Sequence, residues 1–226
     1  MRLAATFLAA AFLAAPAAQA SVAVEKKVLR MALRTAEAGF DPQRIDDRYS
    51  VGVCENLFEP LLTYDYLARP VRLVPLVAEA VPVAEEQGTR YTFRIRPGIL
   101  FADDPAFKGA KRELVAKDIE YSIKRFRDPK NRSPYGWIFE HKLAGLDDLA
   151  DAAAKSGHFD YEAKIAGIEV RDRYTVSFKL LEPDYNFLYL LAMPNVVPVA
   201  REVIEAYGDD THAHPVGTGP YVLKEW

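Results

Sequence analysis

Two segments in which apolar and polar residues alternate constrain the fold of this chain most strongly. They cover residues 91–96 and 173–181, and strict alternation is typical of a β-strand with one buried face. The side chains predicted to point inward are Tyr91, Phe93, Ile95, Tyr174, Val176, Phe178 and Leu180. Separate helical patterns accompany these strands, so the sequence predicts a mixed fold, α/β or α+β.

Apolar residues at helical spacing predict several helices. Residues 113–127 form the clearest amphipathic pattern, with Lys124 on the predicted polar face. An earlier helix is predicted to begin at a Ser50 cap, and on its apolar face Cys54 would be a small buried hydrophobe. The other predicted helical segments are residues 146–164 (a surface helix and loop), 187–193 (a core helix) and 198–207, which Gly208 would end.

The closing stretch, residues 216–226, contains two glycines around a threonine. A dinucleotide-binding pattern would need a third glycine where Val222 stands, and Pro220 has no backbone N–H for a phosphate. We therefore interpret the stretch as a turn that leads into a strand after Pro220. Residues 28–33 predict the first strand of the chain.

Residues 1–20 have the pattern of a secretory signal peptide. Arg2 precedes an uncharged apolar run, which is too short to span a bilayer, and small residues at Ala18 and Ala20 resemble a cleavage site. We expect cleavage after Ala20 and an exported product. The residue directly after that site is a serine and not a cysteine, so we expect no lipid anchor there.

Composition excludes several classes of protein. The formal net charge of −3 gives no reason to expect a nucleic acid or an anionic membrane as a partner. Half of the residues are hydrophobic, which suffices for a packed core. Because Cys54 is the single cysteine, no intramolecular disulfide is possible and stability must come from burial.

Catalytic signatures are absent from the sequence. It contains no Gly-x-Ser-x-Gly elbow, no His-Glu-x-x-His helix and no phosphate-binding Gly-Lys-Ser/Thr loop. The acidic pairs at residues 103–104 and 147–148 lie among turn and surface residues, which favours solvated or capping roles. The sequence therefore predicts a protein that is not an enzyme and has no cofactor.

Two histidines form the best candidate for a metal site. His212 and His214 are two residues apart and would face the same side of an extended segment. His141 and His158 stand alone, so no third or fourth ligand is evident. A polar loop that binds no metal is the favoured interpretation.

A colinear series of motifs carries a family resemblance. It consists of Phe40-Asp41-Pro42, Glu55-Asn56-Leu57-Phe58-Glu59-Pro60-Leu61-Leu62, Leu76-Val77-Ala78-Glu79, residues 91–96, residues 113–125, Ser133-Pro134-Tyr135, the segment from Tyr174 and Gly217-Thr218-Gly219-Pro220-Tyr221. This order resembles the extracytoplasmic solute-binding proteins of family 5, the oligopeptide- and dipeptide-binding periplasmic receptors of ABC transporters. Residues 102–109 depart from the family pattern, because they lack its His/Ser-Asp-Gly turn, and mark a subgroup.

The resemblance implies the type II periplasmic binding protein fold, an α/β architecture of two lobes. Residues 21–50 and 166–226 would form an incomplete sheet core of the first lobe, and residues 51–165 its accessory subdomain. The second lobe would be missing, because family members have about twice the length of this chain. We expect either a fragment or a truncated gene.

The resemblance also implies which residues contact a ligand. The family's contacts after the Asp-Pro turn fall on Asp46, Asp47 and Arg48, and an aromatic contact falls on Tyr135. The carboxylates would attract a ligand ammonium, and Arg48 would offset them or bind a carboxylate. For each residue, the alternative is an ordinary surface loop position.

The implied function is peptide binding by lobe closure and delivery to an ABC transporter permease in the inner membrane. The protein would be a periplasmic monomer. Within the same fold, a receptor for a nickel chelate, haem or a sugar is the alternative. From another class, an exported metal-dependent hydrolase would require a site at His212 and His214.

Overall fold

The structure is a computed structural model that describes residues 27–226. The predicted signal peptide and its cleavage site lie outside the described residues. The chain divides at Leu33 into two units, and each is described by itself. In the part of the chain that the structure describes, no helix has the length and apolar character needed to cross a bilayer.

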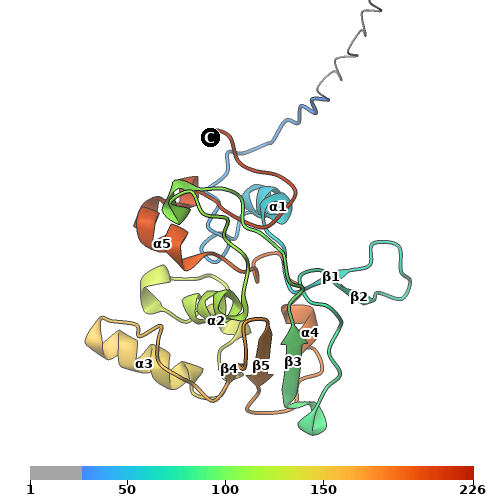
Figure 1. Ribbon diagram of the computed structural model, residues 1–226, viewed down its shortest axis with the longest axis vertical. Helices are drawn as coiled ribbons and strands as arrows, with labels where there is room; N and C mark the ends of the chain where they lie inside the picture. The colour runs from blue at the N-terminus through green and yellow to red at the C-terminus, as the bar shows by residue number, and fades with distance from the viewer. Residues whose placement is uncertain (1–26) are drawn as a thin grey trace, which may run out of the picture. The chain divides into compact units, whose positions relative to one another are not determined.

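Short helices and short strands follow one another in small groups along residues 34–226 (Figure 1). The helices are α1 (Arg48–Leu57), α2 (Ala116–Arg125), α3 (Leu146–Ser156), α4 (Phe187–Leu190) and α5 (Arg201–Tyr207). The strands are β1 (Leu62–Tyr64), β2 (Leu73–Pro75), β3 (Arg90–Arg94), β4 (Ile168–Val170) and β5 (Thr175–Lys179). The predicted mixture of helix and sheet is confirmed.

The two alternating segments pair with each other in one antiparallel sheet of order β3-β5-β4. Tyr91 lies opposite Phe178 and Phe93 opposite Val176, so apolar residues meet across the pair. All four are at most 1% exposed. The sheet joins the predicted accessory subdomain, which holds β3, to the predicted sheet core, which holds β4 and β5. The boundary between these two parts stays a prediction.

Burial on β5 differs from the alternation in one respect. Ser177 was expected on the polar face, yet it is 1% exposed because β5 is the central strand. Its hydroxyl lies 3.2 Å from that of Thr92 and accepts hydrogen bonds from Arg90 and Arg171. Long polar side chains on the neighbouring strands therefore cover this face.

The N-cap of helix α1 lies three residues before the predicted Ser50 cap. Asp47 is the N-cap, since its Oδ1 accepts from the backbone N–H groups of Tyr49 (3.0 Å) and Ser50 (2.8 Å). Ser50 lies inside the helix, and its hydroxyl accepts from the Ala38 N–H. A carboxylate at the N-terminus also interacts favourably with the helix dipole, which explains why Asp47 displaces Ser50 from this role.

Helix α2 is shorter than the predicted 113–127 and more deeply buried. Asp118 accepts from the Val115 N–H at 2.9 Å and fixes the start of the helix. Lys124 was placed on the polar face, but it is 0% exposed. Its ammonium binds Glu120 at 2.7 Å and two backbone carbonyls of the loop that follows α3. That loop covers the predicted polar face of α2. The spacing of residues within the helix gave no sign of this covering loop.

The two terminal strand predictions are wrong for this structure. Residues 28–33 and 221–226 are not in strands. A strand needs a hydrogen-bonded neighbour, and no sheet of the described residues extends to either segment. The turn at Gly217 and Gly219 is retained, and Gly219 donates to the Leu57 carbonyl at the end of α1.

The remaining helix predictions are confirmed in position but not in length. α4 occupies four residues of the predicted 187–193, and α5 begins three residues after Pro198. Gly208 ends α5, as predicted, with its N–H bonded to the Ile204 carbonyl. α3 fills the first part of the predicted surface segment and ends at Gly157.

Cys54 is buried, as predicted, at 1% exposure. Burial raises the pKa of its thiol to about 12, because the thiolate would lie in an apolar environment near Asp41 and Asp47. We expect no reaction with a thiol-specific disulfide reagent at about pH 8 in the folded state and one equivalent after urea unfolding. A rapid reaction of the folded chain would contradict this assignment.

Candidate functional site

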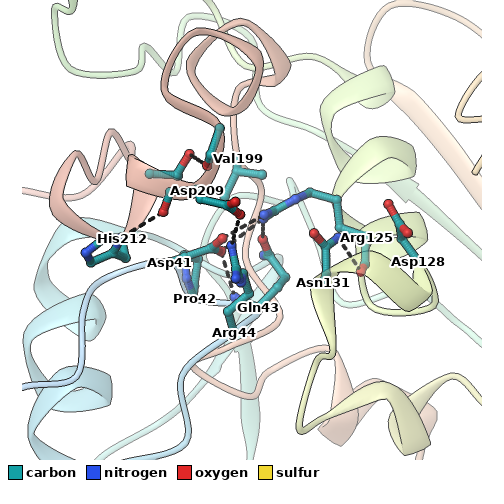
Figure 2. A network of polar contacts seen from close by, with 12 residues as sticks. Asp41, Pro42, Gln43, Arg44, Arg125, Asp128, Asn131, Val199, Asp209 and His212 are labelled. Carbon is teal, nitrogen blue, oxygen red and sulfur yellow. Dashed lines mark hydrogen bonds and ion pairs between the residues drawn. The ribbon is translucent and has the colours of Figure 1, made fainter.

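A loop that begins at the Asp-Pro turn, residues 41–47, leads into α1, and together with Arg48, the first residue of α1, it carries three of the four predicted ligand contacts. Figure 2 shows the polar contacts at the beginning of this loop. A buried ion pair anchors its beginning. Both oxygens of Asp41 accept from the guanidinium of Arg125, on α2, at 3.0 and 2.7 Å. Asp41 is 1% and Arg125 2% exposed. Burial alone would lower the pKa of Arg125, but Asp41 holds it above its ordinary value, so the guanidinium stays charged.

Two amide side chains fix the backbone of the same loop. Asn195 donates to the carbonyls of Pro42 (2.9 Å) and Ile45 (3.1 Å). Gln43 donates to the Val197 carbonyl at 2.9 Å, and its own carbonyl accepts from Arg125. Buried amides that satisfy backbone carbonyls hold a loop in one conformation. The loop is therefore tied both to α2 and to the segment before α5.

The three predicted contacts follow directly from this anchored segment. Asp46 and Arg48 are exposed, and Asp47 is half-buried as the cap of α1. Burial alone would raise the pKa of Asp47, but hydrogen bonds from Ser50 and Tyr49 hold it below its ordinary value. Its Oδ2 is buried and has no partner among the described residues. Asp47 is thus the cap of α1, and a ligand contact at Asp46, Asp47 or Arg48 stays a prediction.

Tyr135 belongs to a different segment of the chain, far from the loop in sequence. It precedes a short 3-10 turn, Gly136–Ile138, and its half-buried ring packs against the main core. In residues 27–226, no hydrogen bond or ion pair joins Tyr135 to the loop at 46–48. The structure brings the three loop residues together and leaves the role of Tyr135 as a prediction.

A cavity of about 610 Å³ borders the anchored loop on the side of Arg44. The rings of Tyr121 and Tyr161 line its wall, with their centroids 4.8 Å apart. The Tyr161 hydroxyl donates to the Asp128 carboxylate at 2.7 Å. Burial raises the pKa of Tyr121 to about 12, so its hydroxyl remains a donor. Arg44 closes one edge through an ion pair with Asp209 at 3.2 Å.

Sequence reasoning missed Arg125 and Asn195 as residues that position the site. Arg125 is in the basic run at the end of α2, where a charge is normally expected to be solvated. Asp41 was interpreted only as part of a turn. The available signal was that Asp41 and Arg125 both lie in family motifs. A buried carboxylate and a buried guanidinium are stable only when they pair with each other.

The candidate metal ligands do not assemble into a site. His214 stacks on Tyr207 with ring centroids 4.2 Å apart, and the His212 Nδ1 lies 2.8 Å from the Asp209 carbonyl. Among residues 27–226, no group of three or more potential ligand side chains could hold a metal ion. His212 also packs edge-on against the Trp226 ring, with ring centroids 5.9 Å apart.

The acidic pairs have the capping and solvated roles that were predicted for them. Asp104 caps a short 3-10 turn and accepts from the Tyr207 hydroxyl at 3.1 Å. Asp103 forms an exposed ion pair with Lys111. Asp147 accepts from the His141 N–H at 2.8 Å and pairs with Arg127. These carboxylates are engaged in structural contacts.

Residues 72–226, more than half of the chain, match the family described as bacterial extracellular solute-binding proteins, family 5 Middle. The chain belongs to this family of solute-binding proteins. The expected resemblance is therefore confirmed.

Two curated relatives and one solved structure show the same relationship. The chain is 29% identical over 220 residues to di/tripeptide-binding protein 2 of Pseudomonas aeruginosa. This match covers 93% of this chain and 38% of that protein. It is 28% identical over 212 residues to the glutathione-binding protein GsiB of Escherichia coli, which covers 94% of this chain and 35% of that protein. The fold is similar to that of peptide-bound OppA from Listeria monocytogenes, with a TM-score of 0.69, 22% identity and coverage of 84% of this chain and 35% of that one. The chain thus has the fold of peptide-binding proteins and spans little more than a third of the relatives' length.

Proposed function

We propose that the chain forms the first lobe of a periplasmic receptor that binds peptides for an ABC importer. The observation that carries this proposal is the family match, together with relatives that are named for binding di- and tripeptides or glutathione. Glutathione is itself a tripeptide, so both names describe small peptidic ligands. The receptor would have no catalytic role and would act as a periplasmic monomer.

The anchored loop supplies the chemistry for recognising a peptide terminus. Asp46 is exposed and forms no ion pair among the described residues, so its carboxylate is available for a ligand ammonium. Arg48, two residues later, presents a guanidinium that suits a carboxylate. The ion pair of Asp41 and Arg125 anchors the loop that carries Asp46 and Arg48 before a ligand binds. An ordered loop lowers the entropic cost of binding.

Transport would follow from closure of two lobes around the ligand. In this mechanism the lobe described here would provide one wall. The proposed division assigns residues 21–50 and 166–226 to its core and residues 51–165 to its accessory part. A ligand enclosed between two walls loses its contact with bulk water, and the closed form docks on the permease. Tyr135 would contribute an aromatic face to the ligand.

A single substitution tests the role of the loop. We expect Asp46→Asn to weaken the binding of a dipeptide with free termini by about tenfold to a hundredfold, because hydrogen bonds to charged groups contribute about 1.5–3 kcal/mol. Isothermal titration of the receptor expressed from its genomic reading frame would measure the change. Asp151→Asn, at an exposed position on α3, is the matched control and should bind normally. Equal affinity of the two variants would reject Asp46 as a contact.

A further inference from the structure

Asp46 lies between two fixed points of the backbone. On its C-terminal side, Asp47 caps α1 and accepts from two backbone N–H groups of that helix. On its N-terminal side, the Ile45 carbonyl accepts from the Nδ2 of Asn195 at 3.1 Å. Asp46 is the single residue between the capped helix and that hydrogen bond, so its conformation depends on both.

The hydrogen bond to the Ile45 carbonyl acts directly on Asp46. The carbonyl group of Ile45 and the backbone nitrogen of Asp46 belong to one planar peptide unit, so a fixed carbonyl oxygen fixes the direction in which the chain enters Asp46. Ile45 is 5% exposed and Asp46 is exposed, which places this peptide unit where the chain passes from the core to the surface. The ion pair of Asp41 and Arg125 holds the chain at a point further from Asp46.

Asn195 is itself held in one position. It is 2% exposed, and its Nδ2 also donates to the Pro42 carbonyl at 2.9 Å, which matches the two hydrogens of an amide nitrogen. Two carbonyl partners require a donor, so the orientation of the amide follows from them. The segment that carries Asn195 is bonded to α2, because the Val199 N–H donates to the Ser122 hydroxyl at 2.8 Å.

We propose that Asn195 is a positioning residue for peptide binding. By fixing the peptide unit in front of Asp46, it sets the direction in which the Asp46 carboxylate meets the ammonium group of a peptide. This inference rests on the proposed function, and it assigns the affinity of the loop to a buried amide that does not touch the ligand. The order that Asn195 imposes before binding lowers the entropic cost of binding.

Hydrogen exchange followed by mass spectrometry tests the order of the loop without a ligand. In the receptor expressed from its genomic reading frame, Asn195→Ala should speed the exchange of the backbone amides of residues 43–48 by about fivefold or more, because the loop opens more often once its carbonyls lose their donor. Asn195→Asp keeps the shape of the side chain and removes both donors, so it should have the same effect. Exchange in β5 should stay unchanged in both variants.

Calorimetric titration then tests the link to the ligand. Asn195→Ala should weaken the binding of a dipeptide with free termini by about fivefold or more, because binding must then restore the order of the freed backbone. In the Asp46→Asn background, the same substitution should change the affinity by less than about twofold, because the carboxylate that it positions is absent. A purely structural role would give the same loss of affinity in both backgrounds.

The matched control is Ser177→Ala, which removes a hydroxyl that is 1% exposed on β5 and whose hydrogen-bond partners among the described residues all lie outside residues 41–48. It should alter neither the exchange of the loop nor the affinity. Unchanged loop exchange in Asn195→Ala and Asn195→Asp, or an equal loss of affinity with and without Asp46, would overturn the proposal. If Asp46→Asn itself bound peptide like the unaltered receptor, the ligand contact and the positioning role would both be rejected, while faster loop exchange would still show that Asn195 orders the loop.

Discussion

Replacing Arg125 by methionine is expected to lower the free energy of unfolding by about 3–5 kcal/mol, because it leaves a buried carboxylate without its partner. Asp41 is 1% exposed, and both of its oxygens rely on Arg125. Gln43 would lose the same donor. Urea unfolding followed by circular dichroism measures the change, which should be visible as a lower midpoint at an unchanged slope.

Two further variants identify the cause. Asp41→Asn in the Arg125→Met background should recover part of the loss, because an amide costs less to bury unpaired than a carboxylate. Lys111→Met breaks an ion pair whose side chains are 67% and 71% exposed, and it should change stability by less than about 1 kcal/mol. If Arg125→Met were no more destabilising than Lys111→Met, the buried pair would not anchor the loop.

Substituting alanine for Gly217 is expected to lower the free energy of unfolding by about 1–3 kcal/mol through overpacking. A Cβ at this position would lie 2.7 Å from the Phe58 ring and far inside the contact distance of the Leu57 carbonyl oxygen. The adjoining segment would have to withdraw from the end of α1. That would cost the hydrogen bond from Gly219 to Leu57, which is 2.9 Å long.

Thermal unfolding measures this effect, with an expected decrease in Tm of roughly 2–12 °C for a chain of this size. Gly52→Ala is the matched control, since Gly52 lies within α1 and a Cβ there meets no atom within 4 Å. It should raise stability by about 0.5–1 kcal/mol, because alanine favours the helix. A Gly217→Ala variant as stable as the unaltered chain would show that the close approach is not required.

The spacing of apolar residues in the sequence predicted those helices and strands that bury one face of their own. The alternation at residues 91–96 and 173–181 identified β3 and β5 and their inward residues, and the helical spacing identified α2. These predictions succeeded because each element presents one face to a core formed by the described chain. The turn at Gly217 was also predicted, although its reason, the close approach to α1, required the structure.

Periodicity failed where burial depends on distant segments. Lys124 is on the polar side of α2 in the sequence pattern, but a loop nearly forty residues later covers it. Residues 28–33 have a strand pattern without a paired strand in the described structure. The site shows the same limit, because motif matches selected Asp46 and Arg48. Asn195 and Arg125 hold the preceding residues Pro42 and Asp41 from remote positions in the sequence.

Calorimetric titration of the receptor expressed from its genomic reading frame with di- to pentapeptides tests the proposed function most directly. We expect saturable binding of at least one peptide with free termini, weaker binding when the N-terminus is acetylated, and much weaker binding by the 226-residue chain alone. Binding of a sugar, haem or a nickel chelate with no response to any peptide would contradict the assignment of a peptide receptor.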